Sequence, residues 1–147
     1  MDTLNCSKTY SEIPFAHRQW RHSGHCSFIH GHNWTIEVVF ESNSLDSNGF
    51  VVDFGELKFI EDWIDRHLDH ACLLSQDDPE LDRFKELEGL GLFKLTLLEN
   101  ASCEGIAKFL FNVFDQLTRE STNDRTWVSR IELYEDTRNK VYYASTN

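Results

Sequence analysis

Two histidines separated by a single residue are the feature of this sequence with the clearest chemical meaning. His30-Gly31-His32 leads into an alternating apolar segment made of Trp34, Ile36, Val38 and Phe40. In a strand, residues two apart point to the same face, so both imidazoles should share a face with the apolar set. This spacing places two nitrogen ligands close enough together to hold one metal ion.

A third histidine can complete such a site. His17 ends an earlier extended run, in which Ile13, Phe15 and His17 share one face. If this run pairs with the strand that carries His30 and His32, the three imidazoles converge. Three protein ligands with a fourth position open is the arrangement of a catalytic zinc site. The alternative is that the His-x-His pattern arose by chance and the histidines are ordinary core residues.

Cys26 lies four residues before His30, a spacing unlike that of a ligand cluster. Its flanking residues are polar and a dication would lie nearby, and both features favour a lowered pKa and a reactive thiolate. The alternative is a buried structural thiol, the usual fate of a free cysteine. A closed metal site would need a fourth protein ligand, and Cys26 is the one residue that the sequence places for that role.

Asp69 and His70 end the first predicted helix. A cationic histidine at that position interacts favourably with the helix dipole. In the functional interpretation, Asp69 instead orients the imidazole of His70 for proton transfer. The sequence leaves both interpretations open.

Two glutamates are further candidates. Glu104 falls in the first turn of a predicted helix, where the dipole alone explains an acidic residue. Glu135 continues the inward-facing set of Ile131 and Leu133, and a carboxylate on an apolar face needs a partner. That partner is either an internal cation or the amine and amide donors of a bound ligand.

Composition and charge restrict the function classes. The chain has 147 residues, 40% hydrophobic and 27% charged, which predicts one domain over residues 1–147. Its net charge of −11 argues against a nucleic-acid partner. No run approaches the roughly 18 apolar residues of a membrane span, and the N-terminus lacks the pattern of a signal peptide. A cytoplasmic location is therefore expected, and in that reducing compartment the four cysteines, which form no C-x-x-C pair, should be free thiols.

Hydrophobic periodicity predicts an α+β fold. An antiparallel four-stranded sheet with two helices on one face, in the order ββααββ, is the expected architecture. We expect Asp53 and Ser102 to cap the two helices, and Pro14 to mark an edge position or a bulge. The expected strands are residues 9–17, 30–41, 128–135 and 140–144. The expected long helices are 55–68 and 102–117, with a short helix at 81–87 and an extended segment at 93–98.

Six motifs in this order make the chain resemble the 6-pyruvoyltetrahydropterin synthase superfamily. The resemblance spans nearly the whole chain, and the three-residue gap between Cys26 and His30 is similar to that of the 6-carboxytetrahydropterin synthase branch, the queuosine-pathway member. The motifs are Phe15-Ala16-His17-Arg18, Cys26-x-x-x-His30-Gly31-His32-Asn33, Gly49-Phe50-Val51-Val52-Asp53-Phe54, Leu68-Asp69-His70, Ser102-Cys103-Glu104 and Tyr134-Glu135.

The resemblance implies a role for each candidate residue. His17, His30 and His32 match the family's zinc ligands, and Cys26 matches its catalytic cysteine. Asp69 and His70 match the family's proton-relay pair. Glu135 matches the glutamate that anchors the pterin, and Glu104 matches a glutamate at a helix start near the pterin pocket. Arg18 and Arg21 are candidates for the triphosphate by position only.

The same resemblance implies the reaction and the assembly. The expected fold is the tunnelling fold (T-fold), commonly a homohexamer of two trimers with active sites between subunits. The expected reaction is zinc-dependent conversion of 7,8-dihydroneopterin triphosphate to 6-carboxytetrahydropterin, acetaldehyde and triphosphate. The alternatives are the sister reaction, which forms a pyruvoyl product without carbon loss, and a non-catalytic zinc- or pterin-binding protein.

The chain departs from the family pattern in two places. The family usually has Asn-Pro-Thr-x-Glu at the second helix, and this chain has Asn100-Ala101-Ser102-Cys103-Glu104. Ser102 keeps the hydroxyl of the cap while the proline is lost. The segment 75–98 is also longer than in compact members of the family.

Overall fold

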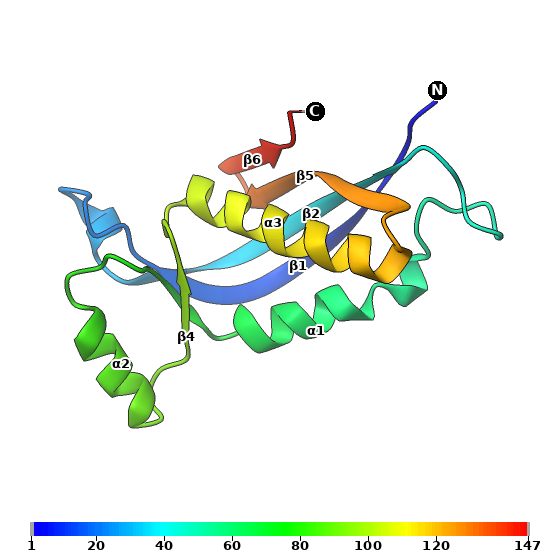
Figure 1. Ribbon diagram of the computed structural model, residues 1–147. Coiled ribbons are helices and arrows are strands. Elements are labelled where there is room, and N and C mark those ends of the chain that lie inside the picture. The colour runs from blue at the N-terminus through cyan, green and yellow to red at the C-terminus, as the bar shows by residue number, and fades with distance from the viewer. Residues whose placement is uncertain (1, 147) are drawn as a thin grey trace.

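A computed structural model describes residues 2–146 as a twisted sheet with helices packed against it (Figure 1). The chain order is β1, β2, α1, β3, α2, β4, α3, β5, β6. The strands are β1 (Leu4–His17), β2 (His30–Ser42), β3 (Cys72–Ser75), β4 (Leu95–Leu98), β5 (Thr126–Tyr134) and β6 (Lys140–Ala144). The helices are α1 (Lys58–His67), α2 (Leu81–Gly89) and α3 (Cys103–Thr122), with short 3-10 turns at His25–Ser27 and Phe54–Glu56.

The expected α+β class is confirmed, but the expected four-stranded antiparallel sheet and the order ββααββ were wrong. The sheet has six strands in the order β4-β3-β1-β2-β5-β6. β3 pairs in parallel with both β1 and β4, so the sheet is mixed. All four residues of β3 are buried, so this strand lacks the alternation by which a half-exposed strand is recognised.

The pairing of the two histidine-bearing strands is confirmed. β1 runs antiparallel to β2, with His17 opposite His30 and Phe15 opposite His32. A register shift lies between Tyr10 and Ile13, which agrees with a bulge close to Pro14. The bulge matters because it lets Tyr10 and Ile13, three residues apart, both point into the core.

The core lies between the sheet and the helices α1 and α3. Trp34, Ile36, Val38 and Phe40 alternate inward along β2 and are fully buried. The predicted stripe of α1 is also buried, as are Ile106, Leu110 and Phe114 on α3. Among the described residues, no helix is long and apolar enough to cross a membrane.

The predicted capping residue begins α3 but not α1. The Ser102 hydroxyl accepts a hydrogen bond from the Gly105 amide at 3.0 Å, and α3 begins at Cys103, directly after Ser102. Asp53 caps the 3-10 turn before α1 rather than α1 itself. α3 ends at Thr122, and the left-handed conformation of the next residue, Asn123 (φ 50°), stops the helix.

Candidate metal centre

Three histidines and one glutamate meet where β1 and β5 end and β2 begins. One ligand atom from each of His17, His30, His32 and Glu135 lies within 4.8 Å of all the others. Ligands held 2.0–2.1 Å from a tetrahedral ion are about 3.3 Å apart, so a small contraction would close this group around a metal.

Backbone hydrogen bonds fix the orientation of two of these imidazoles. His17 Nδ1 lies 2.7 Å from the Ala101 carbonyl oxygen, and His30 Nδ1 lies 2.8 Å from that of Phe28. Because a carbonyl only accepts, each Nδ1 carries the proton and donates. Each Nε2 therefore keeps its lone pair for a metal, the tautomer that such second contacts select in metal sites.

The unsatisfied nitrogens are the observation that best fits a metal. His17 is 4% exposed, and its Nε2 and that of His32 are buried without a hydrogen-bond partner. Burial lowers the pKa of His17 despite the opposing hydrogen bond to Ala101, which favours the neutral imidazole that binds metals. Buried polar atoms without partners are rare, so the donor set fits a cation such as zinc.

Glu135 approaches the histidines more closely than the sequence indicated. Its Oε1 lies 2.9 Å from His32 Nε2 and 3.9 Å from His17 Nε2. The first distance suggests an ion pair, yet the angle does not meet hydrogen-bond geometry. We interpret the three histidine nitrogens as ligands that face a common point, with the Glu135 carboxylate, rather than Cys26, next to the position left open for a substrate.

Trp34 packs beneath the histidines of the metal centre. Its ring centroid lies 5.1 Å from that of His17 and 5.2 Å from that of His32, edge to face in both cases. Phe15 stacks on Trp34 at 4.4 Å, and its carbonyl accepts the indole N–H at 2.9 Å. This satisfied, fully buried tryptophan restricts the positions of the histidines above it.

Cys26 lies on the rim of this region. It is a free, exposed cysteine in the 3-10 turn His25–Ser27, which rules out the buried structural thiol considered from sequence. The adjacent Phe28 carbonyl holds His30, so the turn is tied to the metal centre.

Cys103 is a half-buried neighbour whose importance the sequence did not reveal. Its pKa is raised to about 12, first by burial and then by the charge of Glu135, with smaller effects of Glu104 and Cys26. Its position between Ser102 and Glu104 was the available signal. At neutral pH this thiol stays protonated, so it can donate to Glu135.

Asp69 and His70 form a hydrogen-bonded pair away from the metal centre. His70 Nδ1 lies 2.8 Å from Asp69 Oδ1, and the side chains are 80% and 41% exposed respectively. α1 ends at His67, before both residues, and the imidazole contacts Asp69 rather than a helix carbonyl. The pair therefore has the geometry of an oriented imidazole, but it does not belong to the four-residue group.

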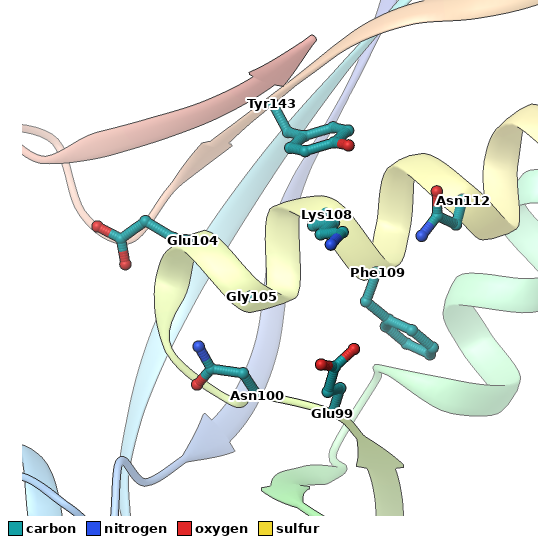
Figure 2. A pocket seen from close by; sticks show the side chains of 8 residues that line it. All are labelled: Glu99, Asn100, Glu104, Gly105, Lys108, Phe109, Asn112 and Tyr143. Carbon is teal, nitrogen blue, oxygen red and sulfur yellow. The ribbon is translucent and has the colours of Figure 1, made fainter. Parts of the chain in front are cut away.

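Glu104 and Glu135 line different cavities. Glu104 lines one of about 390 Å³ on α3, together with Lys108 and Tyr143. Figure 2 shows Lys108 between Tyr143 and Glu99 in this cavity, with Glu104 at its end. Glu135 and His32 line a second cavity of about 590 Å³, which opens directly on the metal centre.

The two arginines considered for the triphosphate are already paired. Arg18 donates to both carboxylate oxygens of Asp78 at 2.7 Å, and Arg21 donates to Asp77 at 2.7 Å. Neither guanidinium is a free cation in this arrangement. These pairs instead fasten the segment that precedes Cys26 to residues 77–78.

This fold and histidine group define a pterin synthase family. The family model described as 6-pyruvoyl tetrahydropterin synthase matches residues 6–146, and the chain belongs to this family, as the sequence motifs indicated. The 6-carboxy-5,6,7,8-tetrahydropterin synthase of Rickettsia felis is 34% identical over 135 residues, covering 90% of this chain and 94% of that protein. The enzyme of the same name from Rickettsia conorii is 33% identical, again covering 90% of this chain and 94% of that protein.

Solved structures support the fold. An uncharacterized protein from Wolinella succinogenes superposes with a TM-score of 0.83 at 19% identity, covering 99% of this chain and 100% of that one. The 6-pyruvoyl tetrahydropterin synthase of Plasmodium vivax gives a TM-score of 0.69 at 17% identity over 100% of both chains. The expected T-fold assignment agrees with these neighbours.

Proposed function

We propose that this protein is a zinc-dependent 6-carboxy-5,6,7,8-tetrahydropterin synthase of the cytoplasm, acting in queuosine and 7-deazapurine biosynthesis. The substrate is 7,8-dihydroneopterin triphosphate, which with one water yields 6-carboxytetrahydropterin, acetaldehyde and triphosphate. The observation that carries the proposal is the buried, unsatisfied Nε2 of His17 beside His32 and Glu135. The identity to named carboxytetrahydropterin synthases supports the choice of reaction.

The metal-binding residues and their chemistry follow from the donor set. His17, His30 and His32 would hold zinc through Nε2. A bound zinc ion would supply a Lewis acid that lowers the pKa of the substrate's side-chain hydroxyls. His17 and His30 are held in place by the carbonyls of Ala101 and Phe28, so the site is largely preorganised.

The other residues handle the substrate and its protons. The exposed Cys26 thiolate would remove the proton from the side-chain carbon next to the ring. His70, oriented by Asp69, would move protons at the hydroxyls. Glu135 lines the larger cavity and would accept hydrogen bonds from the pterin amine and ring N–H. Glu104 would contribute to the wider rim of the pocket.

A homohexamer with active sites between subunits accounts for the separation of these groups. The Asp69–His70 pair lies outside the histidine group of its own chain. β6 is an edge strand, and β3 covers β1 only at Ala16 and His17. Two open edges of this kind favour pairing with further copies, which would bring one chain's His70 to another chain's histidines.

Product analysis tests the proposal. Zinc-loaded protein is incubated with 7,8-dihydroneopterin triphosphate, and the products are identified by mass spectrometry. We expect acetaldehyde and the carboxylated pterin, both lost in Cys26→Ala and both retained in Cys6→Ala, a matched thiol on β1. A pyruvoyl product would assign the sister reaction, and binding without turnover would leave only a zinc- or pterin-binding protein.

A further inference from the structure

Glu12 has an unusual backbone conformation in the middle of β1. Its φ is 57°, in the left-handed region that residues other than glycine and asparagine seldom adopt. The register shift of β1 leaves Ser11 and Glu12 together opposite Thr35 of β2. This is a β-bulge, and bulges redirect side chains, frequently next to active sites. A glutamate kept in this conformation therefore suggests a functional reason.

Glu12 lies on the wall between two cavities, one beside Asp65 and Asp69 and one that opens on the metal centre. This second cavity, of about 590 Å³, is also lined by His32 and Glu135. Thr35 faces the bulge on one side and pairs with Tyr134, next to Glu135, on the other. Because β2 separates β1 from β5, the backbones of Glu12 on β1 and Glu135, directly after β5, lie about 10 Å apart. A bicyclic ring fits between two carboxylates placed in this way.

The Glu12 carboxylate is available to a ligand. It is exposed, and no residue among 2–146 forms a hydrogen bond or ion pair with it. An ionised carboxylate only accepts hydrogen bonds. It therefore attracts an N–H group of a ligand and repels an unprotonated ring nitrogen.

We propose that Glu12 is a specificity-determining residue that selects the 7,8-dihydro pterin ring over the fully oxidised ring. This inference rests on the proposed function of the cavity. A 7,8-dihydropterin carries a hydrogen on N8, whereas the oxidised ring has a lone pair there. Glu135 accepts hydrogen bonds from the amine and ring N–H of the pterin. Glu12 then accepts a hydrogen bond from N8–H of the reduced ring, whereas in the oxidised ring it faces the lone pair of N8.

Isothermal titration calorimetry of metal-loaded protein with 7,8-dihydroneopterin and with neopterin tests this assignment. We expect the wild type to prefer the dihydro compound by at least roughly tenfold, the size of one hydrogen bond to a charged group. Glu12→Gln should reduce that preference to about threefold or less, because an amide can donate as well as accept. Glu86→Gln, an exposed carboxylate on α2, should keep the wild-type preference.

A second variant separates recognition from backbone shape. Glu12→Gly suits a positive φ, so we expect a higher melting temperature together with loss of the preference. Glu135→Gln, which should lose binding of both compounds, reports on the proposed function of the cavity. If it does so while Glu12→Gln and Glu12→Gly both keep the wild-type preference, Glu12 only shapes the bulge. In that case the inference about Glu12 fails and the proposed function stands. If the wild type binds neither compound, the inference fails together with the proposed function.

Discussion

At the scale of single residues, the unsatisfied nitrogens of the histidine group make a direct prediction about metal content. If His17 binds the metal as proposed, His17→Ala removes one ligand and also leaves the Ala101 carbonyl without its donor. We expect at least a hundredfold loss of zinc affinity, more than the 10–100-fold typical of losing an outer-shell contact. Competition with a chromogenic chelator measures it. His25→Ala, on the exposed turn beside Cys26, is the matched control, and equal affinity in both variants would contradict the assignment.

The Arg18–Asp78 pair predicts a pH dependence of stability. Burial would raise the pKa of Asp78, but the hydrogen bonds from Arg18 and the Glu80 amide outweigh it, and the pKa is lowered. A carboxyl whose pKa is lower in the folded state contributes stability above its unfolded pKa of about 3.9, and that contribution is lost as the pH falls through the folded value.

Asp78→Asn should therefore cost about 2 kcal/mol of unfolding free energy at pH 7, since it leaves Arg18 without its charged partner. The difference from the wild type should shrink as the pH falls through the lowered pKa of Asp78. Urea denaturation at pH 7 and at a series of lower pH values measures both effects. Asp77→Asn, whose partner Arg21 is mostly exposed, should change stability little at any of these pH values. A constant deficit across the pH range would show that the charge of Asp78 is not the cause.

At the scale of elements, the first turn of α3 holds the loop that orients His17. A Cβ on Gly105 would lie 2.1 Å from the Asn100 carbonyl oxygen, a backbone atom that cannot move freely. Gly105→Ala should destabilise the protein by about 3 kcal/mol, or roughly 5–10 °C in melting temperature. Gly89→Ala, at the end of α2 with nothing within 4 Å, should be neutral or slightly stabilising. Thermal denaturation followed by circular dichroism compares the two, and equal melting temperatures would contradict the close packing.

The elements also show which parts of the structure the sequence could predict. The alternation in β2, the apolar stripes of α1 and α3 and the Ser102 cap are local signals, and the structure contains all of them. β3 gave no such signal, because its four residues are buried on both faces and its partners β1 and β4 are distant in the chain. The position of Glu135 beside His32 depends on how β5 pairs with β2, a register that no local pattern specifies.

At the scale of the whole molecule, the separation of His70 from the histidine group predicts complementation between inactive chains. In the proposed mechanism, His32→Ala removes a metal ligand and His70→Ala removes the proton relay, so each variant alone should be inactive. If active sites join the histidines of one chain to the His70 of another, co-refolding equal amounts should restore about a quarter of wild-type activity by random assembly. Mixing without unfolding should restore less, because subunits then exchange slowly. A mixture that stays inactive, although light scattering shows a hexamer of both chains, would mean that each site is built from a single chain. The exposed Asp69–His70 pair would then need a different role.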